Sequence, residues 1–135
     1  MQRKTWFVAA VILAGLRATA ASAQSTEYKV PPTATADLVA LCTQRSNDPQ
    51  ADAAIAYCYG YAEGAVDVVL SYGAVGKQSR RPICVPSPAP ALNQVMADFV
   101  AWAGKDPTNL QKPATVGLVS YLVTRFPCPG SGGRR

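Results

Sequence analysis

The residues best placed for chemistry are two carboxylates, Glu63 and Asp67, which lie four positions apart in a predicted helix. Such a pair shares one side of a helix and can in principle hold a proton or a cation. The chain has no histidine, so the commonest general base and every Ser–His or Cys–His nucleophile pair are missing. We therefore expect no catalytic residue and no enzyme activity. Glu63 is interpreted as a solvated side chain, and Asp67 as a structural residue that caps a backbone or pairs with an arginine.

The second set of reactive residues is four cysteines: Cys42, Cys58, Cys84 and Cys128. The gaps between them are 15, 25 and 43 residues, without the C-x2-C knuckles or the histidines that are typical of zinc sites. An even number of cysteines in a small exported domain is typical of disulfides. We therefore expect two disulfides, no metal site and no cofactor.

The first 23 residues have the layout of a secretory signal peptide. A basic start at 1–4 precedes an apolar run at 6–16, and Ala21-Ser22-Ala23 matches the small-x-small pattern for cleavage. The run is about half the roughly 20 residues that a membrane-spanning helix needs. We expect an exported, periplasmic chain without a membrane anchor. Three parts follow the signal peptide: a flexible segment at 24–34, a folded domain at 35–128 and a disordered tail at 129–135.

Four segments carry hydrophobic residues at helical spacing, and none shows the alternation of a strand. Thr35 is predicted to cap the first helix. Asp48 is predicted to cap the second, with Pro49 in its first position, and Gly73 to stop it after about Tyr72. The third begins near Pro88 or Pro90 and the fourth at Pro113, with 105–112 as a turn. Their predicted buried residues include Ile55, Cys58, Ala62, Val66 and Val69; Leu92, Val95, Met96, Phe99 and Ala103; and Val116, Val119, Leu122, Val123 and Phe126. The expected fold is all-α, a small up-down bundle of about four helices stapled by two disulfides.

The bundle favours one disulfide pairing over its alternatives. In alternating helices the end of the first lies near the start of the second, which brings Cys42 toward Cys58. By the same reasoning the start of the third lies near the end of the fourth, which brings Cys84 toward Cys128. The alternative, Cys58–Cys84 with Cys42–Cys128, remains open because the loop at 73–87 is long enough to run back along the bundle.

A strip of small residues runs along the predicted second helix, where Ala56, Gly60 and Gly64 recur every four positions and Asp67 continues the row. Glycine costs roughly 1 kcal/mol in a helix relative to alanine, so its presence needs a reason. Small residues at this spacing let another backbone approach closely. We interpret the strip as a packing site for a helix of the same chain. Contact with a second copy or with a partner protein is the alternative.

Charge and aromatic residues give the candidates for partner binding. Removing residues 1–23 lowers the formal net charge from +5 to about +2, and nucleic-acid binding needs a basic face or stripe. The one basic cluster is Lys77, Arg80 and Arg81, in a loop that is either functional or a solvated connector. Tyr57 and Tyr61 add an aromatic ridge with polar tips suited to an interface. We expect these five residues to contact a protein partner and no nucleic acid.

Several short motifs, in their order along the chain, resemble the Rap/Tai family of type VI secretion immunity proteins. The most specific are C-x-G-Y-x-x-G-x-x-D, from Cys58 to Asp67, and the terminal Phe126-Pro127-Cys128. The others stand in the expected order: Leu41-Cys42, Cys84-Val85-Pro86, Gln94-Val95, Asp106-Pro107 and Pro113-Ala114. The resemblance covers residues 35–128, which is nearly all of the chain after the signal peptide.

The resemblance implies a small all-helical periplasmic protein, often a homodimer, that binds and blocks a peptidoglycan-cleaving amidase injected by another cell. Such an inhibitor needs no catalytic residue, in agreement with the missing histidine. The chain departs from the family at Gln111-Lys112, where a histidine is common, and in its basic, proline-containing loop, so the identity of the amidase does not follow. The alternative function is that of an exported stress or chaperone-like helical protein without a dedicated toxin partner.

Overall fold

The computed structural model describes residues 27–43, 47–75 and 81–129. Within these ranges it contains five helices and no strand: α1 (Thr35–Cys42), α2 (Ala51–Val75), α3 (Leu92–Gly104), α4 (Pro107–Gln111) and α5 (Ala114–Arg125). The predicted all-α fold is confirmed. No helix in these ranges is long and apolar enough to cross a membrane.

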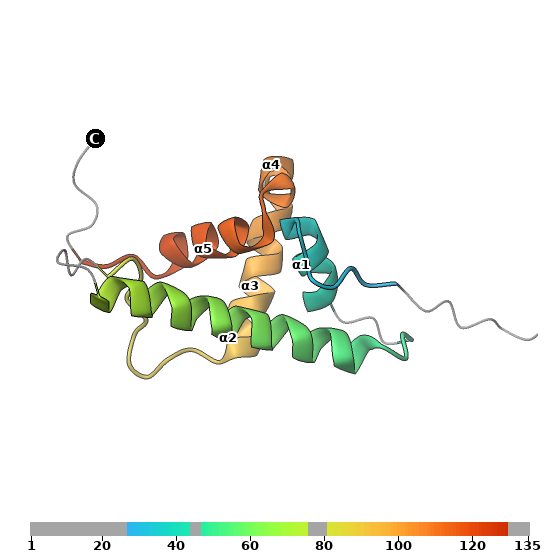
Figure 1. The fold of residues 1–135 in the computed structure, drawn as a ribbon, viewed down its shortest axis with the longest axis horizontal. Helices are drawn as coiled ribbons and strands as arrows, with labels where there is room; N and C mark the ends of the chain where they lie inside the picture. The colour runs from blue at the N-terminus through green and yellow to red at the C-terminus, as the bar shows by residue number, and fades with distance from the viewer. Residues whose placement is uncertain (1–26, 44–46, 76–80, 130–135) are drawn as a thin grey trace, which may run out of the picture.

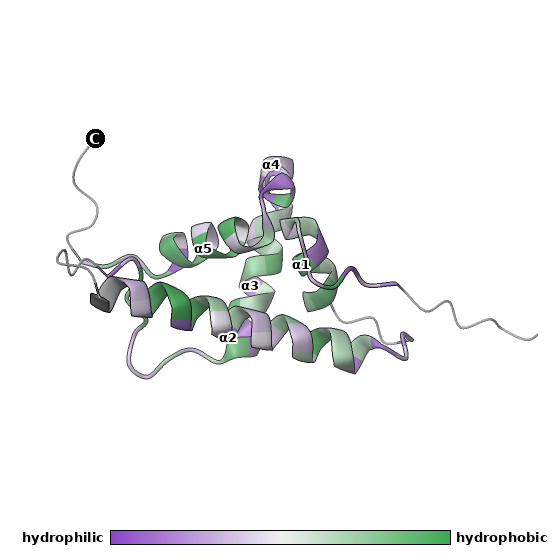
Figure 2. Cartoon of the chain, viewed as in Figure 1, coloured by the Kyte–Doolittle hydropathy of each residue, from purple (hydrophilic) through white to green (hydrophobic). Residues whose placement is uncertain are grey.

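The helices surround α1, which packs against each of the other four. In Figure 1, α2 and α5 lie along the long axis of the molecule and run in the same direction, while α3 crosses them. The crossing of α3 departs from a simple up-down bundle, in which consecutive helices run nearly antiparallel. Figure 2 shows hydrophobic residues along α1, α3 and α5, and hydrophilic ones at α4 and at the start of α2.

The hydrophobic core is built mainly from side chains of α1, α3 and α5. Its largest fully buried hydrophobic side chains are Phe99, Leu38, Leu41, Ile83, Met96 and Leu118. The buried stripe predicted for α3 is confirmed at Val95, Met96, Phe99 and Ala103. On α2, Cys58 and Ala62 are buried as predicted, and Val66 and Val69 pack against the core from a partly buried position.

The first turn of α1 is tied to the start of α5, although about 77 residues separate them in the chain. Thr35 donates from its backbone N–H to the carbonyl oxygen of Lys112 at 2.8 Å, and Ala114 N–H donates to the carbonyl oxygen of Thr33 at 3.0 Å. The Thr35 hydroxyl also donates to the Lys112 oxygen, at 3.0 Å. The prediction that Thr35 caps this helix is wrong, because Ala34 occupies the N-cap position and the threonine side chain is buried.

Aspartate side chains form hydrogen bonds in the turns that precede α2 and α4. Asp48 accepts a hydrogen bond from Gln50 N–H at 2.9 Å in the turn before α2, which begins at Ala51, a few residues after the predicted start at Asp48-Pro49. Asp106 accepts from Thr108 N–H at 2.9 Å and begins α4, with Pro107 in its first turn. The segment predicted as a plain turn therefore contains a short helix, because an aspartate cap followed by proline is also a helix start.

Both disulfides have the pairing favoured by the sequence, Cys42–Cys58 and Cys84–Cys128. The first joins the end of α1 to the middle of α2. The second joins the segment before α3 to the residues after α5, and Cys84 N–H also donates to the carbonyl oxygen of Phe126 at 2.9 Å. The segment at 81–91, which has no regular secondary structure before α3, is thus held against the end of α5.

The buried face of α5 matches the predicted one only in part, since Leu122 and Phe126 are buried as predicted. Its buried residues are Ala114, Gly117, Leu118, Tyr121 and Leu122. Val116 and Val123 are 51% and 42% exposed, so the prediction that these two valines line the core is wrong. The helix has two apolar stripes at helical spacing, and the one that contains Gly117 faces α1 because glycine leaves room for the side chain of Thr35.

Candidate partner-binding surface

The predicted basic loop is described in part. Lys77 and Arg80 lie outside the described residues, as does the whole stretch 76–80 that directly follows α2. Arg81 is exposed and begins the described segment that leads to Cys84. Of the three basic candidates, Arg81 is therefore the one whose position the structure gives, and it stays a predicted contact.

The two tyrosine candidates are partly buried. Tyr57 and Tyr61 pack against the core, and their rings are stacked with centroids 6.4 Å apart. The Tyr61 hydroxyl lies 2.7 Å from Thr115 Oγ1, so it links α2 to the start of α5. Tyr72, near the end of α2, is 80% exposed and was not singled out from the sequence. Its signal is weak, because it lies one residue before the glycine that was expected to end the helix.

The strip of Ala56, Gly60, Gly64 and Asp67 faces away from the core. All four residues are exposed, and a Cβ added to either glycine would meet nothing within 4 Å. The prediction that a helix of the same chain packs on this strip is wrong. A second row of small residues lies on almost the opposite side of α2 and makes that contact instead: Ala54, Cys58 and Ala62.

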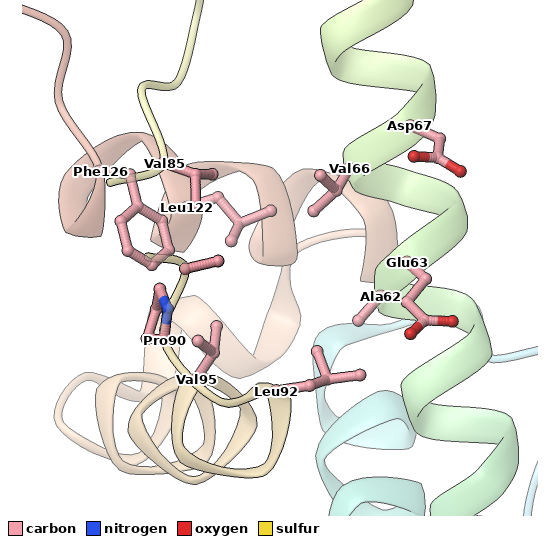
Figure 3. A pocket seen from close by; sticks show the side chains of 11 residues that line it. Ala62, Glu63, Val66, Asp67, Val85, Pro90, Leu92, Val95, Leu122 and Phe126 are labelled. Carbon is pink, nitrogen blue, oxygen red and sulfur yellow. The ribbon is translucent and has the colours of Figure 1, made fainter. Parts of the chain in front are cut away.

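An apolar cleft of about 390 Å³ opens between α2 and the end of α5. Ala62 and Val66 form its wall on α2, and Figure 3 shows both pointing across the cleft. The opposite side is formed by Leu122 and Phe126 of α5 and its flank. The remaining apolar lining comes from the segment before α3 and from its first turn: Val85, Ala89, Pro90, Leu92 and Val95.

Two acidic side chains, Glu63 and Asp67, complete the lining of this cleft. They lie one turn apart on α2 at its edge (Figure 3), and both are exposed. Neither makes a hydrogen bond or an ion pair to the described residues, so the predicted structural contact of Asp67 is not found there. None of the described lining residues is basic, so the described edge of the cleft is acidic.

A second exposed apolar surface lies on α5 alone. Val116, Val119 and Val123, together with Thr115 and Ser120, line an open groove of about 550 Å³. No charged residue of the described ranges lines it, so its chemistry indicates no particular ligand.

The arrangement is suited to binding and offers little for acid–base chemistry. All four cysteines are held in disulfides, so no free thiol is present. Among the described residues no three histidine, cysteine, aspartate or glutamate side chains lie close enough to share a metal ion. Hydrogen bonds from the N–H groups of Ala34 and Thr33 lower the pKa of Asp37 to about 2, which makes this carboxylate a helix-start residue with no proton to give near neutral pH.

Comparison with models of known protein families identifies the family of this chain. A family model described as Rap1a immunity proteins matches residues 34–128. The chain belongs to the Rap1a family of immunity proteins. No curated protein and no solved structure matches it. The resemblance to Rap/Tai-type immunity proteins drawn from the sequence is thereby confirmed.

The matched Rap1a range contains the whole described fold that follows residue 33. It spans all five helices and both disulfides. Immunity proteins act by binding an effector protein and are generally not enzymes, so membership gives this chain a binding function. Its two disulfides are typical of proteins that leave the reducing cytosol.

Proposed function

We propose that this Rap1a protein is a periplasmic immunity protein that binds a peptidoglycan-cleaving amidase delivered by a type VI secretion system and covers its catalytic cleft. The observation that carries the proposal is the family match over residues 34–128. The layout of residues 1–23, typical of a signal peptide, supports export to the compartment where peptidoglycan lies.

The fold suits inhibition by occlusion. Two disulfides and the contacts of α1 with every other helix restrict the relative movement of the helices. A binding surface that is rigid before binding loses little conformational entropy when the complex forms, which favours high affinity. The inhibitor then excludes the large peptidoglycan substrate from the enzyme without any chemistry of its own.

Co-expression tests this function. A bacterial host that exports a candidate amidase, first of all one encoded beside this chain, should lyse without the chain and survive with it. The matched control is the same chain without residues 1–23, which stays in the cytosol and should not protect. The complex should also be recovered from the periplasm, and light scattering gives the number of copies of each partner. Unchanged lysis and no complex with any such amidase would contradict the proposal.

The exposed valines of α5 favour a second candidate function. Val116 and Val123 are large enough, and exposed enough, to contact unfolded client proteins as a chaperone does. Suppression of aggregation of several unrelated proteins, without protection against any amidase, would support this function. Loss of that suppression in Val116→Ser/Val123→Ser would locate it on α5.

A further inference from the structure

We propose that the cleft between α2 and the segment at 81–91 binds a segment of the effector in which an apolar side chain lies next to a lysine or an arginine. This inference rests on the proposed function, and it assigns part of the partner contact to a surface other than the predicted basic loop. Three properties of the cleft carry it: its apolar lining, its acidic edge and the rigidity of its walls.

The apolar lining calls for an apolar side chain. Nine of the eleven residues around the cleft are apolar, and its volume of about 390 Å³ lies within the range of ordinary binding pockets. Val85 is 40% exposed there, although it is large and hydrophobic. A leucine, methionine or aromatic side chain of a partner would cover Val66, Leu92 and Val85 together and remove their surface from water.

The acidic edge calls for a cation beside that side chain. Glu63 and Asp67 are four residues apart on α2, so their carboxylates face the same region of solvent. Among the described residues no basic side chain lines the cleft, and neither carboxylate has a hydrogen-bond or ion-pair partner there. A guanidinium or ammonium group placed there would meet two carboxylates next to an apolar surface, where attraction between charges is stronger than in open water.

The walls of the cleft are fixed in advance. One wall is a long helix, and the other is joined to the end of α5 by the Cys84–Cys128 disulfide and by the bond from Cys84 N–H to Phe126 oxygen. The cleft therefore does not have to be built when the partner arrives. The valine groove of α5 lacks such an indication, because no charged group around it selects an occupant.

Peptide titration tests the cleft directly. The oxidised chain, expressed with its own leader and labelled at its methyl groups, is titrated with short glycine- and serine-flanked peptides that carry a central leucine–arginine pair. The control peptide has glutamate in place of arginine. We expect shifts at the methyl groups of Val66, Leu92 and Leu122, and at least about tenfold weaker binding of the control peptide.

Matched variants separate charge from folding. Glu63→Gln/Asp67→Asn keeps the size of both exposed side chains and should weaken the leucine–arginine peptide about tenfold. Asp52→Asn removes an equally exposed carboxylate of α2 outside the cleft and should change nothing. Equal binding of both peptides, no shift at millimolar peptide, or shifts at Val116 and Val123 instead would overturn the proposal. A variant without residues 130–135 gives one more test, made without any peptide. If this deletion changes the chemical shifts of the cleft methyl groups, the chain's own tail occupies the cleft, and the proposal is overturned.

The effector itself gives the final readout. With an amidase against which the chain protects, E63Q/D67N should raise the Kd at least about tenfold, and D52N should leave it unchanged. Equal Kd values for the two variants would overturn this inference and leave the immunity function standing. If no amidase binds the wild-type chain, the proposed function fails, and the peptide titration still decides whether the cleft binds this kind of segment.

Discussion

Replacing Gly117 with alanine should destabilise the protein, although alanine is the better residue in a helix. Gly117 is buried near the start of α5 and faces α1. A Cβ at this position would lie 2.9 Å from Cγ2 and 3.0 Å from Cβ of Thr35, and closer still to its Oγ1. Carbon atoms that are not bonded prefer separations of about 3.5–4.0 Å, so either Thr35 or α5 has to move.

Thr35 is poorly able to move. It is completely buried, and its hydroxyl and its N–H both donate to the carbonyl oxygen of Lys112. Forcing an extra methyl group into a packed core costs typically about 1–3 kcal/mol, and the gain in helix propensity returns at most about 1 kcal/mol. We expect Gly117→Ala to lower the free energy of unfolding by about 1–2 kcal/mol and Tm by roughly 5–15 °C.

Urea unfolding followed by circular dichroism, with the disulfides intact, measures this effect. Gly60→Ala and Gly64→Ala are the matched controls, because open space surrounds both sites, and each should gain about 0.5–1 kcal/mol. Combining Gly117→Ala with Thr35→Ala should recover part of the loss, with a coupling above about 0.5 kcal/mol. Gly117→Ala as stable as the wild type, or fully additive with Thr35→Ala, would refute the reasoning.

Three further predictions concern pH, a buried hydroxyl and a disulfide. Hydrogen bonds to its ionised form lower the pKa of Asp37 from 3.8 to about 2, so the stability that this carboxylate supplies is complete above about pH 5 and is lost as the pH falls toward 2; a carboxyl NMR titration with a midpoint near 4 would contradict this. Tyr121→Phe removes the buried bond to the carbonyl oxygen of Val95, 3.0 Å long, and should cost about 1 kcal/mol in urea unfolding. Cys84→Ser/Cys128→Ser opens a loop of 44 residues and should cost about 4 kcal/mol in the same assay, and a loss below about 1 kcal/mol would contradict the loop-closure argument.

The fold class, the main helices and the disulfide pairing could all be predicted from the sequence. Proline and short polar residues lie near most of the helix starts, and Asp48 accepts a hydrogen bond in the turn just before α2. The pairing was favoured because Cys42 and Cys58 lie on consecutive helices, and Cys84 and Cys128 near the ends of later ones. This reasoning depends on which segments are neighbours, so it still holds although α3 crosses α2 and α5.

The orientations of α2 and α5 could be predicted only in part, because each helix carries two stripes that fit the same rule. On α2, small residues recur every four positions on both sides, and the row containing Cys58 is the one that the disulfide holds against α1. On α5, the valine stripe is the more hydrophobic, yet the stripe with Gly117 and Tyr121 is buried. The stripe with Gly117 is buried because α5 approaches Thr35 closely there and because the Tyr121 hydroxyl finds a hydrogen-bond acceptor in Val95. Both contacts involve residues that are distant in the sequence.

The cleft was beyond sequence reasoning for a similar reason. Glu63 and Asp67 were recognised as a pair, but their neighbours Val85 and Leu122 come from other parts of the chain. No local pattern places an apolar wall opposite two carboxylates. The family resemblance predicted a partner and left its point of contact open.

The two disulfides also have a consequence for how the chain acquires its covalent structure. Each bond joins cysteines that are consecutive in the chain, Cys42 with Cys58 and then Cys84 with Cys128. A polypeptide that emerges N-terminus first offers the first two thiols to an oxidant before the later two appear. Pairing in order of emergence therefore yields the native bonds without reshuffling. The hydrogen bonds between the start of α1 and residues 112–114 can form only after those residues have been made. The Cys42–Cys58 bond can therefore form before α5 docks against α1.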